Sequence, residues 1–359
     1  MGRENVKLTF KPAPSNTGLV FIREDIDENN LIEAHIKHIS NTDRGTNLDN
    51  GSFRIHTSEH VLAALTGLDI DNCYICIDGA EVPIMDGSSK FFIKAIEDAK
   101  IVEQNALREE FFPAEMISYE CEDSGSKISI IPDEKYSVDT KVNYKTKVLG
   151  IQSATLNNIS DFKDEISSAR TFSFLHELET LLENGLIKGG DLNNAIVYVD
   201  KPLANSNMDR LKKAFNKDSI SVKENGILDN LSLHYPNEAA RHKLLDIIGD
   251  LALIGMKIRG KVVAEKPGHS INAKFAQKVS EVIKSDRKNI LPKLNFDKRP
   301  LMDSNQIMDV IPHRPPFLLI DEVLELSDSH VIGLRKVEKT ESWVEGHFPG
   351  APVMPVYFK

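Results

Sequence analysis

Cysteine and tryptophan are scarce in this chain of 359 residues, which contains three cysteines and one tryptophan. Three cysteines cannot form the network of disulfides that stabilises many secreted proteins, so the composition favours a reducing compartment. Two of them, Cys73 and Cys76, lie in the alternating stretch 72–78, where residues three apart face opposite sides of a strand. We interpret this pair as structural and not as a redox motif.

The chain also lacks long apolar segments and a positive net charge. It contains no run of about 18 apolar residues that could cross a bilayer, and its first residues lack the apolar core of a signal peptide. We therefore expect a cytoplasmic protein without a transmembrane segment. The 44 Lys and Arg are outnumbered by 54 Asp and Glu, which gives a formal net charge of −10. Without an overall basic field we expect no nucleic-acid partner, and an anionic substrate would need a local cluster of basic side chains.

The chain does contain a globular composition arranged in successive segments. Hydrophobic residues make up 41% and charged residues 27%, and this length suits two or three domains. Apolar periodicity predicts helices over 58–66, 90–103, 237–255 and 269–283, strands over 72–78 and 257–265, and a hairpin or loop over 39–51. An α/β pattern restarts near residue 108, and a basic, proline-containing stretch follows residue 283. We predict domains at 1–107 and 108–283, a linker at 284–302 and a further segment at 303–359.

One predicted helix carries a polar stripe on an otherwise apolar segment. His242, Asp246 and Asp250 are spaced by four residues, so each lies about 40° round the helix from the previous one. A histidine and a carboxylate at positions i and i+4 can both reach one metal ion. Taken alone, the stripe is more simply explained by a satisfied buried histidine beside solvated aspartates.

Two distant segments offer the groups that a metal site on this helix would need. Glu59 and His60 adjoin each other at the start of the helix predicted over 58–66, and they supply a third ligand with a carboxylate beside it. His269 follows a predicted strand, where an imidazole not bound to metal could protonate a leaving amine. Two histidines and one aspartate leave an open position for water on Zn²⁺, as in hydrolytic zinc sites. These segments predict a catalytic metal site, and the alternative is that the side chains only stabilise a core.

Five motifs, in this order, resemble those of the UDP-3-O-acyl-N-acetylglucosamine deacetylases, the zinc amidases of lipid A biosynthesis. They lie at residues 55–65, 81–88, 169–174, 241–250 and 266–269. The resemblance covers about residues 4–296. It implies an α+β fold of two β-α-α-β domains packed helix layer to helix layer, with the metal site between them.

The resemblance also implies the chemical role of each candidate group. The metal ligands would be His60, His242 and Asp246, with Zn²⁺ as the cofactor and Fe²⁺ as the alternative ion. Glu59 would be the general base. His269 would be a cationic general acid supported by Asp250.

Further positions match family residues that contact the substrate. Thr171 and Lys243 would stabilise the oxyanion, while Phe172 and Lys266 would contact the sugar-nucleotide part of an acylated UDP-sugar. Residues 174–197 match an insert that forms an apolar passage for the acyl chain, with Leu178 and Leu186 as lining residues, although an amphipathic core helix would show the same pattern. The family begins with a strand before the segment corresponding to Val6, so we expect that edge strand to be absent.

The tail resembles a second family. Residues 308–321 and 346–355 are similar to the start of the 3-hydroxyacyl-(acyl-carrier-protein) dehydratases. That family has a hotdog fold, so the resemblance implies an incomplete hotdog segment at 303–359, in which His347 matches the catalytic histidine. The family's catalytic carboxylate lies further along, on the central helix. We therefore expect no dehydratase activity from this segment alone.

The sequence thus predicts a zinc-dependent deacetylase that hydrolyses the acetamide of UDP-3-O-(3-hydroxyacyl)-N-acetylglucosamine to acetate and a free amine. Two alternatives stay open. The natural protein is bifunctional, with an acyl-carrier protein as a further partner, if its dehydratase part is complete. In the other alternative, the chain is an inactive fragment.

Overall fold

The computed structural model describes residues 5–177, 194–200, 212, 221–228, 231–289, 299–327 and 330–338. The chain divides into two compact units, Met1–Ser285 and Asp286–Lys359, and each is described here by itself. Among the described residues, no helix is both long enough and apolar enough to cross a membrane. The predicted acyl-passage residues Leu178 and Leu186, and the dehydratase candidate His347, lie outside the described residues.

A four-stranded sheet forms one side of the first unit. Its order is β1 (Leu8–Pro12), β7 (Cys73–Ile77), β2 (Leu19–Arg23) and β3 (Leu31–Glu33). Strand β7 runs antiparallel to β1 and parallel to β2. Cys73 and Cys76 are both buried on β7 and neither forms a disulfide, as their structural interpretation expects. Burial raises the pKa of the Cys73 thiol to about 11, which leaves it protonated and unreactive.

A five-stranded sheet forms the other side. Its order is β12 (Ile151–Leu156), β11 (Tyr136–Asn143), β16 (Gly260–Glu265), β10 (Ser126–Ile131) and β9 (Ile117–Cys121). Strands β11 and β16 are parallel and the other neighbours are antiparallel. The predicted strand over 257–265 is therefore divided into β15 (Lys257–Ile258) and β16. The break occurs because the Arg259 N–H donates to Phe111 of β8 (Glu110–Phe111), whereas the Gly260 N–H donates to Lys135 beside β11.

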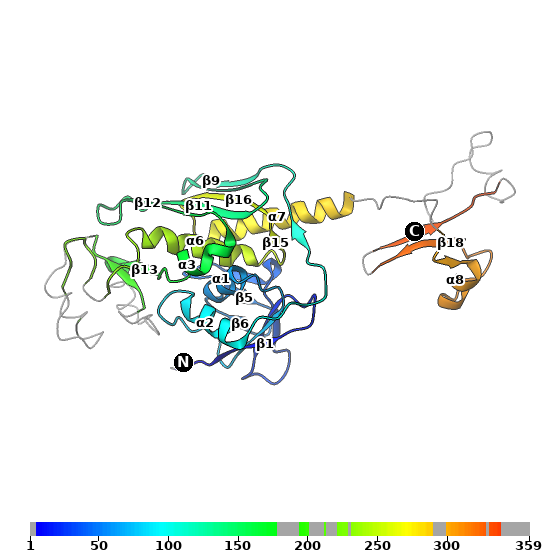
Figure 1. Ribbon diagram of the computed structural model, residues 1–359, viewed down its shortest axis with the longest axis horizontal. Coiled ribbons are helices and arrows are strands. Elements are labelled where there is room, and N and C mark those ends of the chain that lie inside the picture. Colours follow the sequence, from blue (N-terminus) through cyan, green and yellow to red (C-terminus); the bar gives the residue numbers. More distant parts are fainter. Residues whose placement is uncertain are drawn as a thin grey trace. The chain divides into compact units, whose positions relative to one another are not determined.

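The helices lie between these two sheets, as Figure 1 shows for α1 (Glu59–Gly67) and α6 (Glu238–Ala252). Helix α6 packs against β11 and β12, α1 packs against α6 and α2 (Lys90–Ala99), and α2 packs against β1. The helix predicted over 269–283 is confirmed and extends further, as α7 (His269–Asn289). The helix predicted over 90–103 is shorter in the structure and ends at Ala99. Lys100 adopts a φ of 65°, which stops the helical hydrogen bonding after Ala99.

Short elements connect this framework. The polar stretch 39–51 forms a hairpin of β4 (Ile39–Asn41) and β5 (Asn47–Asp49), and β6 (Arg54–Ile55) pairs with β5. Strands β13 (Phe172–Phe174) and β14 (Ile196–Tyr198) form a parallel pair, as do β8 and β15. The 3-10 turn η2 (Ile159–Asp161) is followed directly by the short helix α3 (Phe162–Glu165).

Helices α1 and α6 approach each other backbone to backbone, and this contact builds the candidate site. Gly249 of α6 lies so close to α1 that a Cβ at this position would be 2.1 Å from the Glu59 carbonyl oxygen. Only a glycine permits this approach without a shift of one helix. As a result His60, the next residue of α1, lies beside the polar stripe of α6.

We expect Gly249→Ala to destabilise the protein by about 3 kcal/mol, the upper end of ordinary overpacking costs, because its methyl group meets backbone and not a movable side chain. Urea denaturation measures the change in the free energy of unfolding. Gly268→Ala is the matched control, since a Cβ at Gly268 would have no neighbour within 4 Å. The control should change stability by less than about 0.5 kcal/mol. Equal stability of both variants would show that the helices can separate without cost.

The second unit contains a small antiparallel sheet of β17 (Met302–Asp303), β18 (Glu322–Leu326) and β19 (Val331–Leu334). Helix α8 (Ser304–Val310) follows β17 and begins at a capping box between Asp303 and Gln306. A small core of Ile307, Leu318 and Val323 joins the helix to the sheet. The described residues thus show a mixed α/β structure with several sheets in the first unit and a short sheet-and-helix segment in the second.

Candidate metal centre and active site

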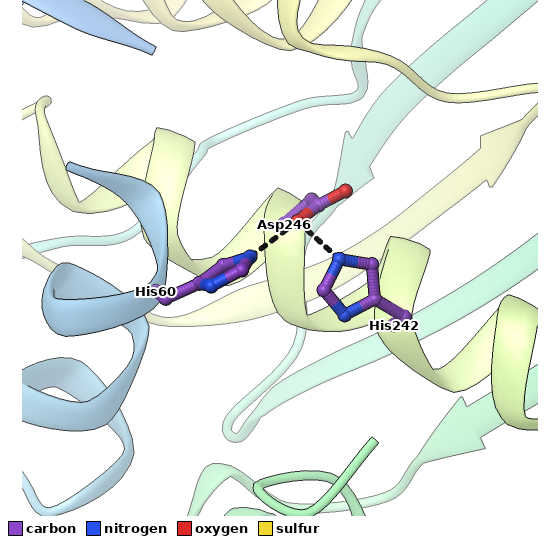
Figure 2. A group of neighbouring side chains, drawn as sticks. All are labelled: His60, His242 and Asp246. Atoms are coloured by element: carbon purple, nitrogen blue, oxygen red, sulfur yellow. Dashed lines mark ion pairs between the residues drawn. The ribbon is translucent and has the colours of Figure 1, made fainter. Parts of the chain in front are cut away.

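Three buried side chains converge where α1 meets α6. His60 extends from α1, and His242 and Asp246 extend from successive turns of α6; they are exposed by 3%, 2% and 1%. Figure 2 shows both imidazoles directed at the Asp246 carboxylate. Asp246 Oδ1 lies 3.4 Å from His242 Nε2 and 3.9 Å from His60 Nε2. One ligand atom from each residue lies within 4.8 Å of the other two.

These separations and the state of the donor atoms fit a divalent metal ion. Tetrahedral zinc with ligand distances of about 2.0–2.2 Å holds its ligand atoms about 3.3–3.6 Å apart, close to the distances found here. Asp246 Oδ1 is buried and has no hydrogen-bond partner among the described residues, which is costly for a carboxylate oxygen. An ion would satisfy it. Two imidazoles and one carboxylate are a donor set that zinc prefers.

Burial sets the protonation of the two histidines. Burial, together with the neighbouring His242, lowers the pKa of His60 to about 3. Burial also lowers the pKa of His242, although Asp246 opposes the shift. Both rings are therefore neutral near pH 7, which is the form that binds metals.

The Asp246 carboxylate is ionised despite its burial. Burial alone would raise its pKa, but the Lys243 ammonium holds the pKa well below its usual range. Lys243 Nζ donates to Asp246 Oδ2 at 2.7 Å. Burial would lower the pKa of Lys243, yet the carboxylate raises it above its usual value, so the ammonium stays charged. The site therefore combines a candidate ligand anion with a fixed cation.

A carbonyl group orients His242. The ring donates from Nδ1 to the Ala169 carbonyl oxygen at 3.1 Å, so the lone pair of Nε2 faces the cluster. The next residue, Arg170, donates from Nε to Glu238 Oε1 at 2.8 Å, and both side chains are buried. Glu238 begins α6 one turn before His242. This ion pair fixes the chain around Ala169 to the same helix that carries two of the candidate ligands.

Glu59 lies beside the triad and is itself only 2% exposed. Burial raises the pKa of its carboxyl group to about 7, although His269 opposes the shift. The Thr46 N–H donates to Glu59 Oε2 at 2.9 Å. A carboxyl group with a pKa close to neutral can accept and release a proton efficiently near pH 7.

His269, at the start of α7, also lies at the cluster. Its Nδ1 donates to Asp250 Oδ2 at 3.0 Å, and its Nε2 lies 3.8 Å from Asp246 Oδ2. Burial would lower the pKa of His269, but Asp250 and Asp246 raise it to about 10. The ring is therefore cationic and can donate a proton. Asp250 is not among the three residues that could hold a metal ion together.

Of the residues predicted to contact the substrate, some adjoin the cluster and others do not. The Phe172 ring lies edge-on to His242 with 6.4 Å between centroids, and the Lys243 ammonium lies 5.6 Å from the Phe172 centroid. The backbone N–H groups of Thr171 and Lys266 donate to Gly87 and Lys141, outside the triad. In the described structure Phe172 and Lys243 thus adjoin the cluster, whereas the backbone hydrogen bonds of Thr171 and Lys266 are made to residues outside it.

Four residues of the site were not predicted from the sequence. Arg170 and Glu238 orient His242 through Ala169, and Asn272 donates to Asp250 Oδ2 at 2.8 Å. The fourth, Thr46, lies in a stretch recognised only as a hairpin or loop. Glu238 could have been found from its spacing four residues before His242, but no local pattern identifies the other three.

Comparisons with known proteins identify the family of the chain. The family model for UDP-3-O-acyl N-acetylglycosamine deacetylase matches residues 1–217 and 207–281, and a FabA-like domain matches residues 311–358. A "Bifunctional enzyme LpxC/FabZ" of Porphyromonas gingivalis is 42% identical over 351 residues, which are 98% of this chain and 76% of the relative. The protein of the same name from Bacteroides thetaiotaomicron is 40% identical with the same coverage.

A relative without the second activity in its name aligns with a smaller part of the chain. The "UDP-3-O-acyl-N-acetylglucosamine deacetylase" of Myxococcus xanthus is 36% identical over 275 residues, which are 76% of this chain and 79% of the relative. Both expected resemblances are therefore confirmed, that of the five motifs to the deacetylase family and that of the tail at 308–321 and 346–355 to a dehydratase-like family. The chain belongs to the UDP-3-O-acyl N-acetylglycosamine deacetylase family and carries a FabA-like segment after it.

Proposed function

We propose that this protein is a zinc-dependent deacetylase of lipid A biosynthesis. Its substrate is UDP-3-O-(3-hydroxyacyl)-N-acetylglucosamine, whose acetamide is hydrolysed to acetate and a free amine. The observation that carries the proposal is the buried cluster of His60, His242 and Asp246, with a carboxyl group and a cationic imidazole beside it. Family membership and the names of the relatives agree with this activity.

The residues around the cluster divide the work of amide hydrolysis. A bound zinc ion supplies a Lewis acid that acidifies water and polarises a carbonyl group. Glu59 accepts the proton of the attacking water at its carboxylate, because its pKa lies near neutrality. His269 donates a proton to the departing amine, and Asp250 keeps the imidazolium charged and oriented. His60, His242 and Asp246 hold the ion and take no part in proton transfer.

The remaining candidate residues would stabilise the charge of the oxyanion or bind the substrate. The Lys243 ammonium is buried beside the cluster and, with Thr171, would stabilise the oxyanion that develops on the amide. Phe172 offers an aromatic face and Lys266 a cation for the sugar nucleotide. Leu178 and Leu186 would line the acyl passage.

The architecture supports a finer description of the fold. One sheet with α1 and α2 and another sheet with α6 and α7 would correspond to two β-α-α-β domains, at 1–107 and 108–283, with the metal site between their helices. The backbone contact between Gly249 and Glu59 supports this arrangement. Residues 284–302 would link these domains to the segment at 303–359.

The segment at 303–359 favours a second, dehydratase-related role. The FabA-like match over residues 311–358 supports a hotdog-type segment, in which His347 would be the catalytic histidine. An acyl-carrier protein would be the partner where the dehydratase part is complete. The absence of dehydratase activity in this chain stays a prediction.

Removal and return of the metal test the deacetylase proposal. We expect the purified protein to bind one zinc ion and to release acetate from the acylated UDP-sugar. A chelator should bring acetate release to background, and zinc, but not magnesium, should restore it, because imidazole ligands suit zinc and magnesium requires oxygen ligands. A metal-free protein that releases acetate at an unchanged rate would contradict the proposal.

A further inference from the structure

Thr46 is fully buried and lies in the turn that connects β4 to β5. Its backbone forms hydrogen bonds with residues at the start of α1. Its carbonyl oxygen accepts hydrogen bonds from the Ser58 N–H at 3.1 Å and from Ser58 Oγ at 2.8 Å. Its own N–H donates to Glu59 Oε2 at 2.9 Å. The hairpin is thereby held against the proposed base by three hydrogen bonds.

The side chain of Thr46 extends towards the proposed acid. Its Oγ1 donates a hydrogen bond to Asp250 Oδ1 and lies 3.3 Å from His269 Nδ1. The other oxygen of the carboxylate, Asp250 Oδ2, accepts from His269 Nδ1 and from Asn272 Nδ2 at 2.8 Å. Thr46 therefore occupies the side of the carboxylate opposite to Asn272, and the two donors fix its plane.

We propose that Thr46 is a positioning residue that couples the general base to the general acid, an inference that rests on the proposed deacetylase function. Glu59 belongs to α1, whereas Asp250 belongs to α6 and His269 to α7. Thr46 is the described residue that hydrogen-bonds to both the Glu59 carboxylate and the Asp250 carboxylate. It sets the distance between the atom that takes a proton from water and the atom that gives one to the amine.

The physical reason lies in the sensitivity of catalysis to small displacements. A shift of about 1 Å at a reacting group can cost about 10²-fold in rate. Without the hydroxyl group, Asp250 Oδ1 would lose its donor, and the carboxylate could rotate with the imidazole that it holds. The backbone bond to Glu59 would remain, so the loss would act through the acid and not through the base.

The test compares two substitutions that differ in the hydroxyl group. Thr46→Val keeps the shape and all three hydrogen bonds of the Thr46 backbone but removes Oγ1, and Thr46→Ser keeps Oγ1 and removes the methyl group. We expect Thr46→Val to lower kcat by about 10–100-fold, as loss of an outer partner commonly does, with KM within about twofold and zinc content unchanged. Thr46→Ser retains Oγ1, so its kcat should stay close to that of the unmodified protein.

A control and a second readout separate positioning from structure. Thr140→Val is the matched control, because Thr140 is 3% exposed and its Oγ1 has no partner among the described residues; its kcat should equal that of the unmodified protein. Imidazole ¹⁵N spectra of the zinc-loaded protein should show a shifted His269 signal in Thr46→Val but not in Thr46→Ser. If Thr46→Val does not fold, Thr46→Ala replaces it and should show the same loss.

The outcomes are distinct. An unchanged kcat in Thr46→Val, an effect on KM alone, or an equal loss in Thr46→Ser would overturn the inference. Absence of acetate release by the unmodified protein would instead overturn the proposed function. In that case an unshifted His269 signal in Thr46→Val would still overturn the link between Thr46 and the imidazole.

Discussion

Replacing Glu59 with glutamine is expected to slow acetate release about 10²–10⁴-fold, the usual contribution of a general base. Glutamine has nearly the same shape and can still accept the hydrogen bond of the Thr46 N–H, but it cannot accept the proton of water. The candidate ligands His60, His242 and Asp246 are unchanged, so zinc content should stay at one ion per chain. Steady-state kinetics and metal analysis on the same preparation measure both quantities.

Glu97→Gln is the matched control for this substitution. Glu97 is exposed and pairs with Lys163 on the surface, where an ion pair contributes at most about 1 kcal/mol. Its rate should not change. A Glu59→Gln protein that keeps its rate would show that another group takes the proton, and one that loses zinc would show that Glu59 acts on the metal.

The second prediction with a large expected effect distinguishes the roles of two aspartates that are one turn apart on α6. Asp246→Asn is expected to weaken zinc binding by more than about 100-fold, because changes of outer partners alone cost about 10–100-fold and this carboxylate is a proposed ligand. Asp250→Asn is expected to keep the zinc ion and to lower kcat about 10–100-fold, because the amide holds the His269 imidazolium less well. Competition with a chromogenic chelator measures the affinity of each variant.

The pair of variants is informative because both remove one negative charge from the same helix face. Asp246 Oδ1 lies within 4 Å of the two candidate histidine ligands, whereas Asp250 contacts Thr46, His269 and Asn272. Equal loss of zinc from both variants would contradict this division of roles. Zinc retained in Asp246→Asn would contradict the ligand set.

The sequence predicted well whatever depends on spacing within one element. The four-residue period placed His242, Asp246 and Asp250 on one face of a helix, and α6 confirms the helix over those residues. The helix predicted over 58–66 is likewise confirmed as α1, which carries Glu59 and His60 side by side at its start. Such predictions need only the geometry of a single helix turn.

Predictions failed where two segments compete for the same backbone. The strand expected over 257–265 is divided, because the N–H groups of Arg259 and Gly260 pair with different neighbours. The end of α2 depends on the backbone at Lys100, a residue type that gives no helix-stop signal. The stretch 39–51 was expected to form a hairpin or loop, yet its sequence does not show that the Thr46 hydroxyl group donates to Asp250.

By itself the sequence determined the kinds of groups in this protein, their order on each helix and the family to which they belong. The tertiary structure decided which groups meet: it brings α1 against α6 at Gly249, so that His60 joins the other two candidate ligands, and it places Thr46 between Glu59 and Asp250. The reason is physical. Direction around a helix follows from the covalent chain, whereas the distance between helices follows from packing of side chains and backbone that are far apart in sequence.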